Sequence, residues 1–117
     1  MRDRLLSWQF ENYPPGHANR VNLLVHLVTV PVFIFGTLLI VSAPWTSLWR
    51  VPVGLVNMFF AVIAQGQGHA REKVGAIPFT GPVDVVSRLF VEQWITFPRF
   101  VLSGGFARSW RAAGEGR

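Results

Sequence analysis

One feature constrains the fold of this chain more than any other: 21 consecutive residues, 23–43 (LLVHLVTVPVFIFGTLLIVSA), without Asp, Glu, Lys or Arg. An α-helix needs about 20 apolar residues to cross a bilayer core about 30 Å thick. The run therefore predicts a membrane span. It is longer than the apolar region of a typical signal peptide and leads into Pro44 and Trp45 rather than a small-residue cleavage pattern, so we expect the span to be retained.

A second apolar stretch, residues 51–64 (VPVGLVNMFFAVIA), has 14 residues and is too short to cross a membrane by itself. It reaches spanning length only if Gln65, Gln67 and His69 also enter the membrane or a protein-lined cavity. Polar groups at membrane depth are costly and are usually functional or paired. We therefore expect a second span over residues 51–72 whose polar end carries the function.

Residues 44–50 (PWTSLWR) join the two stretches as a short interfacial loop, with Trp45 and Trp49 at headgroup level. Basic residues gather at the other end of this hairpin: Arg2, Arg4 and Arg20 precede the first span, Arg71 and Lys73 follow the second, and Arg50 is alone in the loop. The positive-inside rule then places both ends of the hairpin in the cytoplasm. We expect an integral protein of a bacterial inner (cytoplasmic) membrane with both termini cytoplasmic.

After a loop at residues 75–82 (GAIPFTGP), residues 83–102 alternate apolar side chains with three charges, Arg88, Glu92 and Arg99, that fall in one narrow helical stripe. If this helix crossed the membrane, the basic tail would lie outside, against the charge rule. We therefore expect the helix to lie in the interface.

The predicted fold is all-α: a small integral membrane helical bundle forming one domain over residues 1–117. Its parts are an N-terminal interfacial segment (1–16), a first span (17–43), a second span (51–72), a third amphipathic helix (83–102) and a flexible, glycine-rich tail (103–117).

Composition narrows the function. The chain has no cysteine, which excludes a disulfide scaffold, a thiolate nucleophile and a Cys-ligated metal centre. Its net charge of +5 is spread along the chain rather than gathered in a basic patch, so we expect no nucleic-acid partner.

The three histidines, His17, His26 and His69, each lie beside amides or an acid within or next to an apolar stretch. In a helix beginning near residue 18, His26 shares one face with Asn19 and Asn22. His17 can reach the same centre only from a non-helical turn that folds back. In the second span, the spacing of Gln65, His69 and Glu72 likewise places the three side chains on one helical face.

Imidazoles with one carboxylate and no thiolate suit a non-haem Fe(II) site, and they also suit zinc or manganese. We predict that His17, His26, His69 and Glu72 are the metal ligands and catalytic residues. Asn19, Asn22 and Gln65 are expected behind them as hydrogen-bonding residues.

The charged stripe of residues 83–102 has two interpretations. In the simpler interpretation it is a solvated helix face on which Arg88 pairs with Glu92, four residues further on. In the functional interpretation, Arg88 or Arg99 binds the carboxylate of a fatty acid.

A family resemblance rests on the pattern Tyr13-x3-His17-x-Asn19-x2-Asn22-x3-His26-x4-Pro31, followed by Gln65-x2-Gly68-His69 and Glu72. Over about residues 10–100 the chain resembles the Mpo1-like (DUF962) membrane proteins. The resemblance implies a small multi-helix membrane protein with iron held by histidines. It also implies an Fe(II)-dependent dioxygenase that shortens 2-hydroxy fatty acids by one carbon. This chain departs from the family in having Thr29 where a glycine is usual, and in a His69-to-Glu72 spacing one residue shorter.

Three hypotheses follow. The first is an Fe(II)-dependent dioxygenase for α-oxidation of 2-hydroxy fatty acids or related lipids, with O2 as co-substrate. The second is a non-enzymatic membrane scaffold whose polar residues join helices. The third is a haem electron carrier with two axial histidines. So few helices bury little polar surface by themselves, which leaves homo-oligomerisation open.

Overall fold

Helices make up all the regular secondary structure of residues 3–115, the part of the chain that the computed structural model describes. The two longest are α2 (Arg20–Ser42) and α3 (Arg50–His69), connected through the 3₁₀ turn η2 (Ala43–Trp45). The shorter elements are α1 (Leu5–Glu11), the 3₁₀ turn η1 (Pro14–Gly16), α4 (Pro82–Val91), the π-helical turn η3 (Glu92–Thr96), α5 (Phe97–Leu102) and α6 (Gly105–Gly114). The predicted all-α class is confirmed for these residues.

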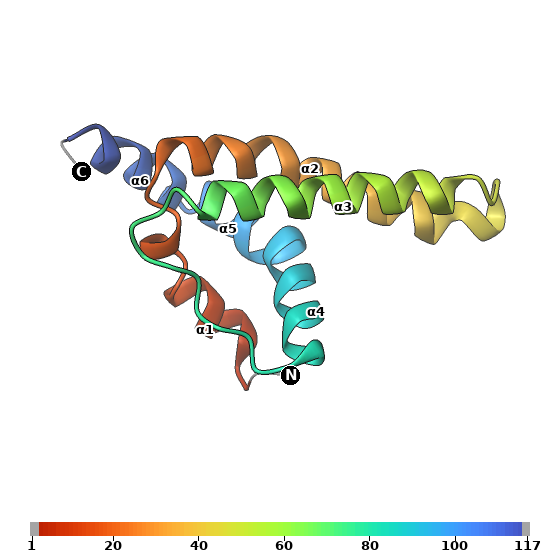
Figure 1. Ribbon diagram of the computed structural model, residues 1–117, viewed down its shortest axis with the longest axis horizontal. Helices are drawn as coiled ribbons and strands as arrows, with labels where there is room; N and C mark the ends of the chain where they lie inside the picture. Colours follow the sequence, from red (N-terminus) through yellow and green to blue (C-terminus); the bar gives the residue numbers. More distant parts are fainter. Residues whose placement is uncertain (1–2, 116–117) are drawn as a thin grey trace.

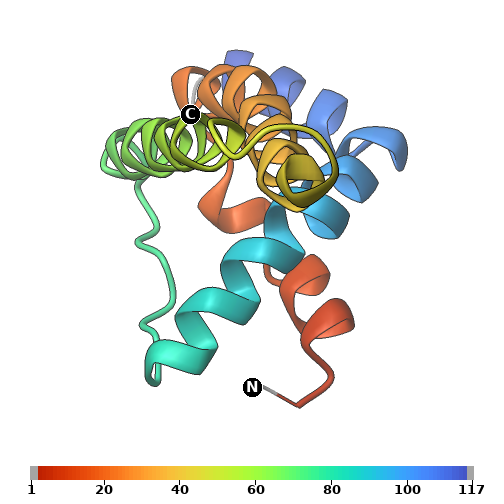
Figure 2. The same cartoon turned by 90° about the vertical axis from the view of Figure 1, so that its right-hand side faces the viewer.

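Helices α2 and α3 form an antiparallel hairpin along the longest dimension of the molecule (Figures 1 and 2). By length and composition, the stretches Arg20–Trp45 and Arg50–His69 could each cross a membrane. Large apolar side chains on both helices, among them Val28, Val56 and Phe59, are exposed. Trp45 and Trp49 are exposed at the tip of the hairpin, where the sequence predicts the headgroup level.

Two glycines, Gly36 of α2 and Gly54 of α3, form a close backbone contact within the hairpin. A Cβ atom on Gly54 would lie 2.5 Å from the backbone oxygen of Gly36, and a Cβ atom on Gly36 would lie 2.7 Å from that of Gly54. The backbones therefore approach more closely than any other residue type would allow, as small residues permit in packed membrane helices. Near the other end of the hairpin, Gly68 faces Asn22 with no room for a side chain. This approach brings the start of α2 against the end of α3.

The remaining helices gather at that end of the hairpin. Helices α1 and α4 extend away from the hairpin on one side, and residues 70–81 run from the end of α3 to α4 (Figure 1). The buried core consists of Tyr13, Leu23, Val30, Phe97 and Phe100, with Phe106 and Trp110 of α6 packed against it. The core thus ties α2 to the turn before it and to the C-terminal helices.

The third helix differs from its prediction. Residues 83–102 do not form one regular helix, because the π-helical turn η3 separates α4 from α5. A π turn inserts one residue into the helical ladder and shifts the side chains on either side of it. The charges of this segment therefore do not share one stripe.

The prediction of a flexible tail over residues 103–117 is wrong for most of its length. Residues 105–114 form α6, where the rings of Phe106 and Trp110 stack with centroids 6.2 Å apart. Nε of Arg20 donates to the backbone oxygen of Trp110 at 3.0 Å, and its guanidinium lies 4.5 Å from the Trp110 ring centroid. Two aromatic residues one turn apart thus anchor the helix despite its glycines. Residues 116–117 lie outside the described part, as do residues 1–2 of the predicted N-terminal segment.

Gly54→Ala tests the glycine contact. The new methyl group must displace the backbone of Gly36, so we expect a loss of about 1–3 kcal/mol in unfolding free energy, the usual cost of overpacking. Gly66→Ala on the same helix is the matched control, because a Cβ there meets nothing within 4 Å. It should keep or raise the stability, since Ala is the better helix former. Thermal unfolding in detergent measures both, and equal melting temperatures would contradict the close approach.

Candidate metal centre

His17 reaches the centre of the molecule from a turn. It directly follows η1 with a backbone that is neither helical nor extended (φ −136°, ψ 56°), and its side chain is buried. Its Nδ1 lies 2.9 Å from the backbone oxygen of Tyr13. A carbonyl oxygen can only accept, so Nδ1 carries the hydrogen and the lone pair of a neutral ring is on Nε2.

His26, the seventh residue of α2, is held in the same way. It is fully buried, and its Nδ1 lies 3.0 Å from the backbone oxygen of Asn22. This contact fixes the tautomer and leaves Nε2 free to bind a cation. Nε2 of both His17 and His26 is buried and makes no hydrogen bond to any described residue.

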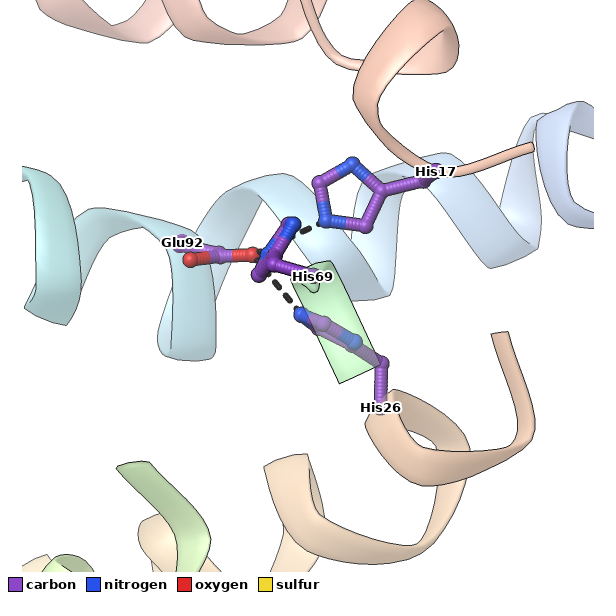
Figure 3. A group of neighbouring side chains, drawn as sticks. All are labelled: His17, His26, His69 and Glu92. Atoms are coloured by element: carbon purple, nitrogen blue, oxygen red, sulfur yellow. Dashed lines mark ion pairs between the residues drawn. The ribbon is translucent and has the colours of Figure 1, made fainter. Parts of the chain in front are cut away.

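His69 and Glu92 complete the group. His69 is the last residue of α3, and Glu92 is the first residue of the π-helical turn η3. One ligand atom from each of His17, His26, His69 and Glu92 lies within 4.8 Å of the others. Figure 3 shows the four side chains, from four different elements, converging on one point. The three imidazole centroids are 4.7–5.0 Å apart, which leaves no gap for the porphyrin of the haem hypothesis.

The charges of this group suit a bound cation. Oε2 of Glu92 lies 3.4 Å from Nε2 of His17 and 3.3 Å from Nε2 of His26. Burial opposes ionisation of Glu92, but hydrogen bonds and positive charge from His17 and His26 hold its pKa well below the usual range. The buried carboxylate therefore needs a positive charge beside it. That charge can be a proton on Nε2 of His17 or His26, or a metal ion bound by the four groups.

Tyr13 supports two members of the group at once. Its ring stacks on His17 with centroids 3.6 Å apart and planes 8° from parallel. Its hydroxyl donates to Oε2 of Glu92 at 2.8 Å, while its backbone oxygen accepts from His17. Burial, and then the charge of Glu92, raise the pKa of the Tyr13 phenol well above its usual value, so the phenol keeps the proton that it donates.

Glu72, the predicted acid, lies elsewhere and is not among the four converging groups. Its Oε1 accepts from the backbone N–H groups of Ala18 and Asn19, both at 3.0 Å, and its Oε2 accepts from Nδ2 of Asn22 at 2.7 Å. The carboxylate therefore caps the start of α2, where the helix dipole favours a negative charge.

The other predicted residues take supporting positions. Asn19 is the N-cap of α2, and its side-chain oxygen accepts from the backbone N–H of Asn22. Asn22 connects the Glu72 carboxylate to the carbonyl that orients His26. Gln65, one turn before His69, exchanges two hydrogen bonds with Gln93 (2.9 and 2.8 Å). This buried amide pair locks the π-helical turn to α3 next to Glu92.

Arg88 and Arg99, the predicted carboxylate-binding residues, are occupied by the fold. Arg88 donates to the backbone oxygen of Ile77 at 3.0 Å and lies 3.4 Å from Asp84, rather than pairing with Glu92. The guanidinium of Arg99 lies 3.8 Å from the centroid of the Phe10 ring.

Sequence reasoning missed Glu92 because it assumed a regular helix. In that geometry, Glu92 lies one turn from Arg88 and pairs with it on the surface. The π-helical turn begins at Glu92 itself and directs the carboxylate inward. No residue pattern in this chain predicts such a turn, although π turns occur frequently at functional sites.

The fold and the site together define a helical protein with two helices of spanning length and a buried three-histidine, one-carboxylate group that could hold a metal ion. Nitrogen and oxygen donors of this kind bind divalent transition metals such as Fe(II), zinc and manganese. Comparison with models of protein families, with curated proteins and with solved structures finds no match for the chain.

Glu92→Gln and Glu72→Gln form a matched pair that distinguishes a metal ligand from a carboxylate that only caps a helix. Removing the charge of Glu92 should lower the bound metal at least about tenfold. Glu72→Gln should keep the metal but lower the unfolding free energy by about 0.5–2 kcal/mol, because it weakens the cap of α2. Metal content per folded protein and thermal unfolding in detergent measure the two effects. Equal metal loss in both variants would contradict the assignment.

Tyr13→Phe tests the support of the centre. The variant keeps the ring that stacks on His17 and the backbone carbonyl, and loses only the hydroxyl that bonds Glu92. Metal affinity should fall about 10–100-fold, the usual cost of losing a hydrogen bond to a ligand. A Co(II) titration against a chelator measures it. Thr37→Val, which removes a hydroxyl bonded within α2, is the control and should bind as the unaltered chain does.

Proposed function

We propose that this protein is an integral membrane metalloenzyme, an Fe(II)-dependent dioxygenase that shortens 2-hydroxy fatty acids by one carbon. The main evidence for a metal is the buried group itself. The hydrogens of His17 and His26 are on Nδ1, and Nε2 of each ring faces the Glu92 carboxylate without a hydrogen bond. A protein interior rarely leaves such atoms unsatisfied unless a bound group completes them.

The choice of iron rests on donor type and on resemblance. A set of imidazoles with one carboxylate and no thiolate is typical of non-haem Fe(II) oxygenases. The Mpo1-like pattern includes Tyr13, His17, His26 and His69, which are the residues that meet or support the centre. The family's acid is expected near residue 72, whereas the carboxylate that faces the histidines in this chain is that of Glu92.

A lipid substrate fits the position of the centre. The group lies where the start of α2 meets the end of α3, at the polar end of two helices whose outer faces expose apolar side chains. A fatty acid in a bilayer can present its carboxyl end at this level while its chain stays among other chains. Membrane insertion and this depth are part of the proposal.

The overall reaction balances without a further reductant. One 2-hydroxy acid, R–CHOH–COOH, and one O2 give R–COOH, CO2 and H2O. The bond between the two terminal carbons breaks, the hydroxyl-bearing carbon is oxidised to a carboxyl group, and O2 takes up the four electrons. The reaction therefore requires no reductase domain and no redox-active thiol.

When bound, iron supplies the site at which the hydroxy acid and oxygen meet. His17, His26, His69 and Glu92 would hold it, and the single negative charge of Glu92 offsets part of the charge of the ion. Tyr13 keeps Glu92 in place through its hydroxyl and His17 in plane through its ring. The buried Gln65–Gln93 pair holds the π-helical turn that begins at Glu92 against α3.

The test is elemental analysis of protein purified anaerobically in detergent, followed by oxygen uptake on adding a 2-hydroxy fatty acid. We expect near-stoichiometric iron, uptake that depends on substrate, and a product one carbon shorter. The unsubstituted fatty acid of equal length is the control and should cause no uptake. Iron without oxygen uptake would contradict the proposed substrate, and zinc or manganese in place of iron would contradict the proposed redox chemistry.

His26→Ala and His69→Ala should each abolish metal binding, since each removes one donor from a group of four. Circular dichroism of the same samples checks that the helices persist. Full metal content in both variants, or a folded parent protein without metal, would favour the scaffold hypothesis, in which the buried Gln65–Gln93 pair only joins helices.

A further inference from the structure

A cleft of about 570 Å³ lies on the outer side of the turn that carries His17. Three segments far apart in the sequence form its walls: the η1–α2 turn with Pro14 and Ala18, residues 71–74 after α3, and the face of α6 that carries Arg108. His17 points inward from this turn to the metal centre, so the cleft and the centre lie on opposite sides of one wall.

Three cations, Arg71, Lys73 and Arg108, line the cleft. Arg71 and Lys73 are exposed and form no ion pair or side-chain hydrogen bond with any described residue. Arg108 makes one long contact, 3.4 Å from Nη1 to the backbone oxygen of Ser103. The charges of these three side chains are therefore accessible to a ligand in the cleft.

The acid that lines the cleft does not neutralise them. Both oxygens of Glu72 accept hydrogen bonds from the start of α2: from the backbone N–H groups of Ala18 and Asn19 and from the side chain of Asn22. Its charge is thus offset by the helix terminus rather than by a cation. The walls keep an excess of positive charge in a concave surface, which concentrates the field on an anion.

We propose that this cleft binds a phosphate group, carried by an anionic lipid or by a free phosphate ester. A phosphate monoester offers three oxygens in a tetrahedral arrangement, which suits cations that approach from two separate walls, α6 and the segment after α3. A carboxylate offers only two oxygens in one plane. The phosphate chemistry is independent of the metal, and only the lipid as its source rests on the membrane placement proposed above.

The position of the cleft favours the lipid. Arg71 and Lys73 directly follow α3, one of the two helices long and apolar enough to span a membrane. Cations just beyond a span lie at the level of phosphate headgroups. Beside the cleft, on the other face of α6, Leu24, Phe106 and Trp110 line a largely apolar groove that could accept part of an acyl chain.

The test uses the full chain in detergent and four probes: dioctanoyl phosphatidic acid, dioctanoylglycerol, glycerol 3-phosphate and inorganic phosphate. Binding is followed by calorimetry in the unaltered chain, in an Arg71→Gln/Arg108→Gln double variant and in Arg4→Gln. Arg4 is the control, because it is exposed and carries the same charge but lines neither this cleft nor the apolar groove.

We expect phosphatidic acid to bind and the double variant to bind it more weakly, by about tenfold for each lost cation contact. The affinity of Arg4→Gln should stay within about twofold of that of the unaltered chain. Dioctanoylglycerol, which lacks the phosphate, should not bind. If glycerol 3-phosphate or inorganic phosphate binds as tightly as phosphatidic acid, with the same dependence on Arg71 and Arg108, the site is confirmed and its ligand is a free phosphate.

Three results would overturn the proposal: binding of dioctanoylglycerol equal to that of phosphatidic acid, equal losses of affinity in the double variant and in Arg4→Gln, or no binding of any phosphate probe. Metal content is measured on the same samples. We expect it to be unchanged in the double variant, so a failure of the phosphate site is distinguishable from a failure of the metal centre.

Discussion

Three imidazoles and one carboxylate meet at the centre of this structure, and the surrounding fold holds them there. Lone pairs of His17 and His26 face the carboxylate of Glu92, with His69 beside them. In water these groups would be solvated, and in an apolar interior they are costly without a cation. A bound metal ion would offset this cost and add to the stability of the fold.

The supporting contacts come from every part of the chain. Tyr13 orients both His17 and Glu92. Asn22 accepts a hydrogen bond from His26 through its backbone oxygen and donates one to the capping carboxylate of Glu72 through its side chain. The Gln65–Gln93 pair joins α3 to the π-helical turn. Because each support also secures a helix, the site and the fold depend on the same hydrogen bonds. Close approach at Gly68 and at the Gly36–Gly54 contact sets the distance between the helices that carry His26 and His69.

The location of the centre supports the lipid substrate proposed for it. Two helices with exposed apolar faces lead up to it, and a basic cleft lies across the wall formed by the η1–α2 turn. One short turn thus separates a group suited to a metal from a surface suited to a phosphate. Glu72 affects both the metal centre and the cleft. Its carboxylate caps α2, the helix that carries His26, and because it is used there it does not neutralise the cations of the cleft.

The sequence by itself determined the helical class, the two long apolar helices and the three histidines, because apolar run length and helical spacing are local properties of the chain. It also required His17 to act from a non-helical turn, since the spacing to His26 allows no common face otherwise. It could not supply the fourth ligand. Glu92 is 23 residues beyond His69 in the sequence, and it faces the histidines only because a π-helical turn replaces a regular one. Glu72 has the better local spacing, but the N–H groups at the start of α2 compete for its carboxylate. The order of the tail was likewise decided in three dimensions, where the contacts of Phe106 and Trp110 with the core outweigh the flexibility of the glycines.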